Sequence, residues 1–515
     1  MLSPATSYDA LVQGFAWDLP DRLNMADQVL AWPGDRVAII DLTGPRQDVT
    51  YGELGAMADG IAGALLARGV MCGDRVGVLR SQDAWTAAAH IAIWKIGAIS
   101  IPLFKLFMKE ALTSRVTDAG ARHVITDAEG RGMLAALDGV CPLVPEHETL
   151  GDDPVETAQT GPEDPAVLIY TSGTTGSPKG ALHGHRVLTG HLPGVEISHD
   201  FLGQEGDCLW TPADWAWIGG LFDVLMPGLA LGVPVVAARM AKFNVDECVK
   251  IVSQAAVKNV FFPPTALRML KAADAKIAGL RSVASGGEPL GAEMLAWGQR
   301  SFGLTINEFY GQTECNMVAS SCSALFDPVP GCLGRAVPGH EIAVLDAQGR
   351  PTQAEGDVAI RRGSASMMLG YWNRPDETAA RFRGAWMLTG DRGIREGEYL
   401  RFVGREDDVI TSGGYRIGPA EIEDCLMRHR AVSTVGVVGK PDPLRTEIVK
   451  AYVVLRVGAP ATSAMADELQ EFVKERLARY SYPREIQFLQ ELPMTVTGKV
   501  IRKELKARAA AEGHQ

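Results

Sequence analysis

Apolar and polar residues alternate along residues 51–104 in a way that predicts a layered α/β domain. Apolar residues recur at helical spacing in residues 53–69, and the short apolar run of residues 74–80 follows. A second helical pattern covers residues 83–97 and leads into another apolar run at residues 98–104. Helices and strands that alternate in this way, with glycine at the helix ends, are typical of parallel strands joined by crossover helices. We therefore predict a doubly wound sheet in this part of the chain.

The same alternation of helix and strand returns at residues 115–127 and 244–263, and residues 281–290 read as a strand that runs into a glycine-rich turn. The most apolar stretch, residues 216–238, contains Asp223, two prolines and four glycines. These interruptions suit a buried helix, a turn and a strand better than a membrane span.

The pattern changes after about residue 335. Residues 340–362 alternate apolar and polar positions around glycine and proline turns, which predicts antiparallel hairpins. A compact α+β unit is expected at the end of the chain. Its predicted helices and strands are residues 419–429, 432–440, 448–457 and 466–480. We place the domain boundary between residues 1–404 and 405–515, with the charged segment GREDD (404–408) as a hinge.

Length and charge narrow the class of protein. A chain of 515 residues is longer than one hydrophobic core supports, so at least two domains are expected. Lys and Arg number 50 against 62 Asp and Glu, a net charge of -12, which argues against a nucleic-acid partner. A local cluster of donors can still bind a small anionic ligand.

The eight cysteines are scattered and form no C-x-x-C pair, so reduced thiols are expected rather than zinc ligands or a disulfide framework. The first residues show no basic segment followed by an apolar run. We therefore expect a cytoplasmic protein without a membrane span, and the sequence leaves its oligomeric state open.

Residues 170–180 form the most unusual segment, YTSGTTGSPKG, directly after the apolar run DPAVLIY. A loop of Gly, Ser and Thr at the end of a buried strand can direct backbone N–H groups and hydroxyls at one anion. Pro178 separates Lys179 from the glycine and serine before it, so the spacing is not that of a P-loop NTPase. The segment indicates an anion-binding loop rather than a linker.

Six motifs in order carry a resemblance that spans nearly the whole chain. They are the loop YTSGTTGSPKG, SGGEPL (285–290), FYGQTE (309–314), MLTGD (387–391), GREDDVITSGGYRIGPAEIE (404–423) and PMTVTGKVIRKEL (493–505). Together they resemble the adenylate-forming acyl-CoA synthetases, with medium-chain members the most similar.

The resemblance implies a fold and a two-step reaction. The fold is α/β: a large N-terminal domain of doubly wound sheets with a small β-barrel-like subdomain, followed by a small mobile α+β C-terminal domain. In the first step a carboxylate attacks the α-phosphate of Mg-ATP, which gives acyl-adenylate and pyrophosphate. In the second step the thiol of coenzyme A displaces AMP.

The resemblance also implies roles for residues that bind the nucleotide. The β- and γ-phosphates would be held by Thr171, Ser172, Gly173, Thr174, Thr175, Gly176 and Lys179. The adenine would lie beside Gly287, Glu288 and Pro289, with Tyr310 stacked on it and Gln312 nearby. Thr313 would bind the α-phosphate, and Glu314 would hold Mg²⁺, which prefers carboxylate and phosphate oxygens. Asp391 would accept both ribose hydroxyls, with Arg405 beside it.

Lys499 is the expected catalyst of adenylation, because a lysine can stabilise the charge that develops around the α-phosphorus. Asp407 matches the hinge about which the C-terminal domain turns between the two steps. Gly413, Gly414 and Tyr415 would then line the channel for coenzyme A, and Arg416 would contact phosphate in the first pose. His183 and His185 follow the phosphate loop, but an ionised carboxylate needs no general base at pH 7.

Gly311 and Trp217 are the residues expected to shape the acyl pocket. The acetate-specific members of the family that this chain resembles have Trp where this chain has Gly311. The resemblance therefore implies a larger acyl pocket here. No Lys or Arg is evident in the expected pocket, which disfavours a second carboxylate on the substrate. We expect a medium-chain or branched aliphatic acid, with an aromatic acid of the benzoate or cinnamate type as the alternative. A stand-alone adenylation domain that charges a carrier protein is the other alternative, although no pocket aspartate is evident.

Overall fold

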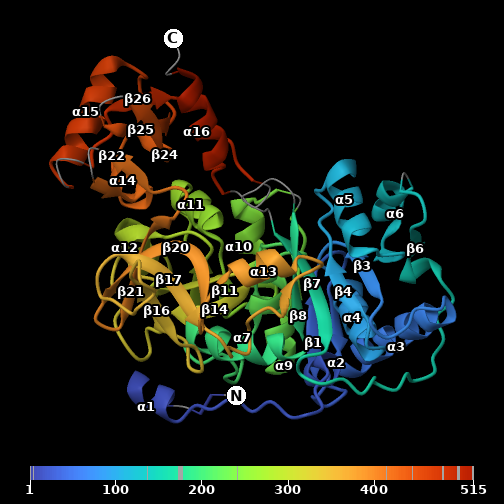
Figure 1. Ribbon diagram of the computed structural model, residues 1–515. Helices are drawn as coiled ribbons and strands as arrows, with labels where there is room; N and C mark the ends of the chain where they lie inside the picture. The colour runs from blue at the N-terminus through green and yellow to red at the C-terminus, as the bar shows by residue number, and fades with distance from the viewer. Residues whose placement is uncertain are drawn as a thin grey trace.

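The computed structural model shows four β-sheets with helices packed on their faces (Figure 1). The residues that it describes are 2–3, 5–135, 137–171, 178–240, 242–412, 415–442, 445–477, 481–495 and 499–512.

The largest sheet is mixed and crosses the middle of the molecule. Its order is β15 (Arg335–Ala336), β14 (Cys315–Ser320), β13 (Ile306–Gln312), β12 (Ser282–Gly286), β11 (Asn259–Phe261), β9 (Leu209–Trp210), β10 (Val235–Ala237), β1 (Val37–Asp41) and β2 (Gln47–Thr50). The pairs from β13 through β12, β11, β9 and β10 to β1 are parallel, whereas β14 runs antiparallel to β13.

The second sheet contains the strands that were predicted from the alternating helix and strand patterns of residues 51–104 and 115–127. Its order is β18 (Gly370–Tyr371), β8 (Lys179–Gly184), β7 (Pro165–Thr171), β4 (Ile99–Pro102), β3 (Arg75–Leu79), β5 (His123–Thr126) and β6 (Cys141–Leu143). The strands from β7 to β6 pair in parallel, and all four residues of β4 are buried. Burial on both faces is what a parallel sheet with crossover helices requires. The predicted doubly wound arrangement is confirmed.

The helices of the large domain begin and end where local chemistry allows. Thr50 and Glu53 form a reciprocal capping box at the start of α3 (Tyr51–Ala67), and the Asp83 carboxylate caps α4 (Ala84–Lys95). The other helices of this domain are α1 (Tyr8–Gln13), α2 (Met25–Val29), α5 (Lys109–Ala119), α6 (Ala128–Leu134), α7 (Arg186–Ser198), α8 (Ile218–Gly220), α9 (Met226–Ala230), α10 (Val245–Gln254), α11 (Pro264–Ala272), α12 (Gly291–Phe302) and α13 (Pro375–Ala380).

The apolar stretch at residues 216–238 is folded as predicted. It forms α8, a π-helical turn at Leu221–Leu225, α9 and strand β10. Most of its residues are deeply buried in the core, and those that are partly exposed are Trp217, Ala230, Leu231 and Pro234.

An antiparallel sheet follows, where hairpins were expected. Its strands are β16 (Ile342–Leu345), β17 (Gly356–Arg361), β20 (Trp386–Glu396), β19 (Phe382–Arg383) and β21 (Tyr399–Arg405). The β20–β21 pairing places Asp391 opposite Arg405. This register matters for the site described below.

The C-terminal domain has its own sheet and its own apolar core. The sheet contains β23 (Tyr415–Ile417), β22 (Ile410–Ser412), β25 (Thr446–Leu455), β24 (Val432–Asp442) and β26 (Glu485–Phe488), and its helices are α14 (Pro419–Met427), α15 (Ser463–Lys474) and α16 (Arg502–Ala511). The separate α+β unit is confirmed, whereas the boundary at residues 404 and 405 stays a prediction. All eight cysteines are free thiols in the described structure.

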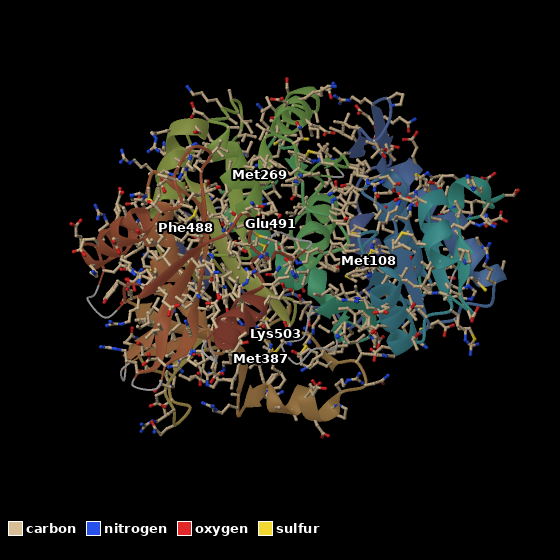
Figure 2. All side chains as sticks on the ribbon, turned by 90° about the horizontal axis from the view of Figure 1, so that it is seen from above. Met108, Met269, Met387, Phe488, Glu491 and Lys503 are labelled. Carbon is tan, nitrogen blue, oxygen red and sulfur yellow. The ribbon has the colours of Figure 1, made fainter. Side chains whose placement is uncertain are left out.

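The C-terminal domain lies on one side of the large domain. In Figure 1 it covers the yellow and green part, where α11, α12 and β20 lie, and the blue N-terminal part stays uncovered. Figure 2 shows the same arrangement from above. At this junction, helix α14 of the C-terminal domain packs against β21 of the antiparallel sheet that precedes it.

Candidate active site

A cleft of about 1160 Å³ lies where the C-terminal domain meets the large domain. It gathers most of the residues singled out from the sequence, although they come from segments more than three hundred positions apart. Those that line it are Thr171, Lys179, Trp217, Gly287, Glu288, Pro289, Tyr310, Gly311, Gln312, Thr313, Glu314, Asp391, Arg405 and Lys499.

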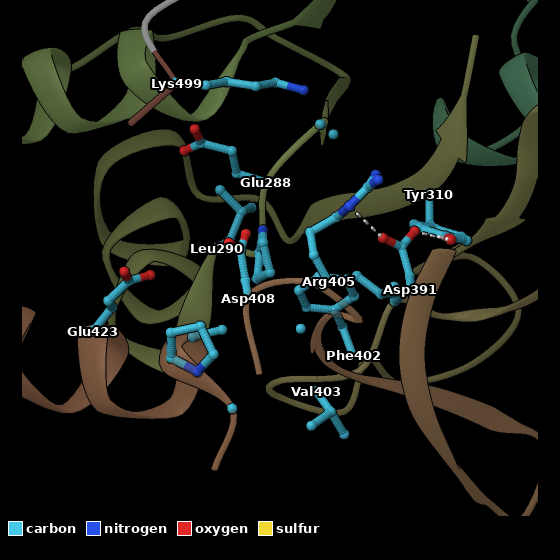
Figure 3. A pocket seen from close by; sticks show the side chains of 18 of the residues that line it. Glu288, Leu290, Tyr310, Asp391, Phe402, Val403, Arg405, Asp408, Glu423 and Lys499 are labelled. Atoms are coloured by element: carbon cyan, nitrogen blue, oxygen red, sulfur yellow. Dashed lines mark hydrogen bonds and ion pairs between the residues drawn. The ribbon is translucent and has the colours of Figure 1, made fainter. Parts of the chain in front are cut away.

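Asp391 is the centre of one charged group in the cleft (Figure 3). It is 5% exposed, accepts a hydrogen bond from the Tyr310 hydroxyl, and lies 3.5 Å from Nε of Arg405. Burial raises the pKa of the Asp391 carboxyl, and the positive charge of Arg405 opposes that rise. The β20–β21 register holds the acid and the cation together, so this carboxylate is fixed in place as a hydrogen-bond acceptor.

Glu314 is the centre of a second charged group. It lies in the turn between β13 and β14 and is 7% exposed. Its Oε1 accepts a hydrogen bond from the Tyr371 hydroxyl and lies 3.2 Å from Nη2 of Arg381. Arg381 also donates to Oε1 of Gln312 at 3.1 Å. Tyr371 and Arg381 were not predicted, because they lie outside the recognised motifs.

The anion-binding loop joins two paired strands. Thr171, the last residue of β7, is opposite Lys179, the first residue of β8. Lys179 forms an ion pair with Glu377 on α13. Ser172, Gly173, Thr174, Thr175 and Gly176 lie outside the described residues, so their predicted contacts with phosphate are not tested.

Lys499 extends into the cleft from the C-terminal domain (Figure 3). Its Nζ lies 5.7 Å from the centre of the Trp217 ring, and a Cβ on Gly287 would lie 3.6 Å from the same nitrogen. Burial lowers the pKa of the Lys499 ammonium, while the negative charges of Glu288 and Asp391 oppose the decrease. The predicted catalyst therefore lies beside two of the predicted nucleotide- and acyl-binding segments.

The part of the cleft that was predicted to hold the acyl group is largely aromatic. The ring centres of Trp217 and Phe261 are 6.2 Å apart, and those of Phe261 and Phe309 are 5.1 Å apart. A Cβ on Gly311 would lie 2.2 Å from Oδ1 of Asn316, so this position has no room for any side chain without movement of its neighbours.

One residue of this region was misjudged from the sequence. Asp223 lines the cleft and is bonded to Asn316, with 2.7 Å between Asn316 Nδ2 and Asp223 Oδ1. The expectation that the pocket holds no aspartate is therefore wrong. Asp223 was visible only as the one acidic residue in an apolar stretch, a signal that does not reveal which way the side chain points.

His183 and His185 have the environment of structural side chains. Both are fully buried, and burial lowers the pKa of His183 to about 3 and that of His185 to about 4. The ring of His185 accepts a hydrogen bond from the backbone N–H of Met25. Neither lines the cleft.

The predicted hinge and coenzyme A channel are described only in part. Asp407 lies 3.7 Å from Nε of Arg405 through its Oδ1, and its carbonyl accepts a hydrogen bond from Lys506. Gly413 and Gly414 lie outside the described residues, as do the side chains of Tyr415 and Arg416. Their roles stay predictions.

Two family models match this sequence. The model described as AMP-binding enzyme covers residues 25–372, and the one described as AMP-binding enzyme C-terminal domain covers residues 421–499. The chain belongs to the AMP-binding enzyme family. The second match ends at Lys499, the residue that reaches into the cleft.

The relatives of this chain include coenzyme A synthetases, the class of enzyme that its motifs resemble. An acetyl-coenzyme A synthetase of Bacillus subtilis is 34% identical over 87% of this chain and 82% of its own length. The mitochondrial acyl-coenzyme A synthetase ACSM4 of Rattus norvegicus is 32% identical over 96% of this chain and 90% of its own length. Among solved structures, the anthranilate CoA ligase AuaEII in complex with anthranoyl-AMP has a TM-score of 0.88 at 27% identity, covering 97% of this chain and 99% of that one.

Two searches of the described residues gave negative results. Every helix there is too short or too polar to cross a lipid bilayer. The same residues contain no group of three or more His, Cys, Asp or Glu side chains placed to bind a metal ion. A Mg²⁺ ion shared with substrate phosphates needs only one or two protein carboxylates, so this result does not test the role predicted for Glu314.

Proposed function

We propose that this chain is an AMP-forming acyl-CoA synthetase, which activates a carboxylic acid with ATP and transfers the acyl group to coenzyme A. The observation that carries the proposal is the position of Lys499. It extends from the C-terminal domain to Gly287 and Trp217, in a cleft that also holds Asp391 and Glu314. One cation thus lies between a candidate nucleotide region and a candidate acyl region.

In the first step, a carboxylate oxygen of the substrate attacks the α-phosphorus, and the bond to the pyrophosphate oxygen breaks. Negative charge gathers on the non-bridging oxygens as the new bond forms. Lys499 stabilises that charge, and Thr313 holds the α-phosphate in line. Lys179 and the anion-binding loop hold the departing pyrophosphate, so the ion pair between Lys179 and Glu377 gives way to phosphate when ATP binds.

The Asp391 group orients the nucleotide. Asp391 accepts hydrogen bonds from the ribose hydroxyls while Tyr310 and Arg405 hold its carboxylate in position, with Tyr310 beside the adenine. Because these contacts exist within the protein alone, the acceptor is preorganised before ATP arrives.

Glu314 fits a role in holding Mg²⁺. Both of its contacts with Tyr371 and Arg381 use Oε1, and in the described part of the chain Oε2 has no protein partner. A hard cation shared with phosphate oxygens suits this free carboxylate oxygen. Bound Mg²⁺ would neutralise charge on the phosphates.

The second step requires a different position of the C-terminal domain. We propose that residues 405–515 turn about Asp407, which removes Lys499 from the cleft and brings Gly413, Gly414 and Tyr415 to the acyl-adenylate. The thiol of coenzyme A then attacks the acyl carbon, and AMP leaves as its phosphate oxygen takes the bonding electrons.

The acid is proposed to be a monocarboxylic acid larger than acetate, with medium-chain or branched aliphatic acids favoured. The aromatic walls at Trp217, Phe261 and Phe309 support this choice. The missing side chain at Gly311 does not add to it, because Asn316 fills the space where that side chain would begin. An aryl acid is the second candidate, because flat rings pack well between aromatic walls and the related ligase AuaEII was solved with anthranoyl-AMP.

The test is acid-dependent release of pyrophosphate from ATP by the purified chain, measured with acetate, butyrate, octanoate and benzoate. Pyrophosphate should appear with ATP, Mg²⁺ and the preferred acid, and a thioester should form only after coenzyme A is added. Pyrophosphate release that no acid stimulates would refute the function. A rate with acetate above all other acids would refute the proposal of an acid larger than acetate.

A further inference from the structure

Asp223 is a carboxyl group that the proposed reaction does not use. It lies in the π-helical turn Leu221–Leu225, where the other four side chains are fully buried and apolar. Asp223 itself is 3% exposed and lines the cleft beside Trp217 and Gly219. An acidic group in such surroundings is costly unless something compensates for the loss of water.

The protein compensates for this burial only in part. Asn316 donates from Nδ2 to Asp223 Oδ1 at 2.7 Å. Nε2 of His191 lies 4.0 Å from the same oxygen, beyond hydrogen-bond distance. Within the described part of the chain, Oδ2 of Asp223 receives no hydrogen bond.

His191 does not supply a counter-charge. Its Nδ1 lies 2.7 Å from the carbonyl oxygen of Val187, a contact that requires the proton on Nδ1 and leaves Nε2 bare in the neutral ring. Burial lowers the pKa of His191 to about 4, and burial raises the pKa of Asp223 well above its ordinary value. No other charged side chain contacts Asp223 in the described structure.

Within the described structure, the side-chain atoms of this pair that have no hydrogen-bond partner are Oδ1 of Asn316 and Oδ2 of Asp223. The side-chain amide of Asn316 donates a hydrogen bond to Asp223. Its Oδ1 lies next to the place where a side chain on Gly311 would begin. Asp223 contributes Oδ2. Gly311 lies between Tyr310 and Gln312 in the motif assigned to the adenylate, so the pair lies next to that motif on the acyl side. Oδ1 of Asn316 accepts a hydrogen bond, and Oδ2 of Asp223 accepts one when the carboxyl is ionised or donates one when it is protonated. The place therefore fits a ligand group that can donate a hydrogen bond.

We propose that Asp223 and Asn316 select an acid whose acyl chain carries a hydroxyl or amino group. The inference rests on the proposed function and refines its substrate. A hydroxyl group can donate to Asn316 Oδ1 and also accept from a protonated Asp223. An ammonium group pairs with the ionised Asp223 carboxylate. Its positive charge compensates for the cost of burying that negative charge.

The expected preference is large enough to measure. A site that keeps polar groups for a substrate hydroxyl or amine discriminates strongly against the analogue that lacks it, because its own groups are then left unpaired. We expect kcat/KM for the best substituted acid to exceed that of the unsubstituted acid of the same length by about tenfold or more.

The experiment compares pyrophosphate release for butyrate, hexanoate, octanoate and benzoate with that for their hydroxyl- and amino-substituted forms. Asp223→Leu replaces the carboxyl by an apolar group of similar size, and Asp223→Asn keeps the shape without the charge. Asp246→Leu, at an exposed position on α10, is the control. The full-length chain is used throughout.

The wild type should prefer a substituted acid, and Asp223→Leu should move that preference to the unsubstituted one, with the control unchanged. Asp223→Asn should keep a preference for hydroxyl and lose one for amine, which separates the two donors. Equal loss with every acid in Asp223→Leu, or a wild type that prefers unsubstituted acids, would overturn the inference and leave the synthetase function intact. If no acid stimulates pyrophosphate release, the proposed function fails and the inference fails with it.

Discussion

The two ends of the cleft are built on different principles. At the end proposed to bind the nucleotide, called the nucleotide end, the carboxylates of Asp391 and Glu314 each contact a cation and a phenol. Asp391 has Arg405 and Tyr310, and Glu314 has Arg381 and Tyr371. At the acyl end the walls are aromatic, and the one carboxyl, Asp223, contacts only an amide in the described structure.

This difference indicates where each end gets its specificity. At the nucleotide end, charged contacts within the protein hold the carboxylates of Asp391 and Glu314 in place before a ligand binds. Among the described residues of the acyl end, none supplies a counter-charge for Asp223, so the ligand itself completes the hydrogen bonding there. Variants at the two ends should therefore fail in different ways, one in the use of ATP and the other in the choice of acid.

The largest effect is expected from Lys499→Ala, which removes the cation between the two ends. A charge pair at about 4 Å contributes roughly 4 kcal/mol at an effective dielectric constant of 20. The adenylation rate should therefore fall about 10³-fold. Pyrophosphate release measures this step, and thioester formation from supplied acyl-adenylate measures the other.

Lys503→Ala is the matched control, because Lys503 is exposed on the neighbouring helix α16 (Figure 2). It should leave both steps near the wild-type rate. If Lys499→Ala slowed the thioester step as much as adenylation, the residue would be structural. It would then not act as a catalytic cation between the two ends of the cleft.

The same contrast explains how far the sequence could predict the site. Asp391, Glu314 and Lys499 lie in motifs that resemble those of the adenylate-forming acyl-CoA synthetases, so the resemblance was enough to single them out. Tyr371 and Asp223 could not be singled out in this way, because their partners Glu314 and Asn316 are 57 and 93 positions away. Contacts of that kind depend on how sheets and helices pack, which local patterns do not record.

The fold shows a similar limit. Alternating helical and apolar segments were enough to predict parallel strands such as β3 and β4, and the periodic pattern located helix α4 within two residues. The order of strands in the largest sheet was not predictable, because β9 lies between β10 and β11. Non-consecutive neighbours arise from tertiary packing of the crossover helices.

A second prediction tests the nucleotide end alone. Asp391→Asn removes the negative charge that faces Arg405 and weakens the acceptor proposed for the ribose. Hydrogen bonds to charged groups contribute about 1.5–3 kcal/mol, so KM for ATP should rise roughly 10- to 100-fold while the ranking of acids stays the same. Steady-state kinetics with ATP varied at saturating acid measures this.

The control for Asp391→Asn is Asp357→Asn. Asp357 is a carboxylate on β17 that pairs with Arg392 and does not line the cleft. Its KM for ATP should be unchanged. A changed order of acids in Asp391→Asn, with ATP use unaffected, would show that the two ends are not separate.

Gly311→Ala tests the acyl end by adding a group to the cleft instead of removing a charge from it. The new methyl group would lie 2.2 Å from Asn316 Oδ1 and 2.8 Å from the Asn316 Cα atom, so the Asp223–Asn316 pair must move. Overpacking costs about 1–3 kcal/mol. We expect kcat/KM for the preferred acid to fall about tenfold, with little change in KM for ATP.

Gly63→Ala serves as the control for Gly311→Ala. Gly63 lies on α3, where an added methyl group meets no heavy atom within 4 Å. A rise in KM for ATP without loss of acid use in Gly311→Ala would place Gly311 at the nucleotide end and contradict its assignment to the acyl pocket.

The smallest effect concerns pH and the cation that joins the two ends. Burial lowers the pKa of Lys499 below that of an ordinary lysine. As pH rises through that pKa, the ammonium loses its proton and can no longer stabilise charge on phosphate. kcat/KM for ATP, which reports ionisation in the free enzyme, should therefore decrease on the alkaline side, by about tenfold for each pH unit beyond the pKa.

Lys499→Arg keeps its charge at high pH, since a guanidinium does not deprotonate in this range. The variant should be slower at pH 7.5 because the planar head group is placed differently, but its alkaline decrease should disappear. Thioester formation from supplied acyl-adenylate, followed over the same pH range, corrects for ionisation of coenzyme A and for unfolding. Coincident alkaline decreases in the wild type and Lys499→Arg would assign the titration to another group, and the cation between the two ends would then have no measured role in the pH profile.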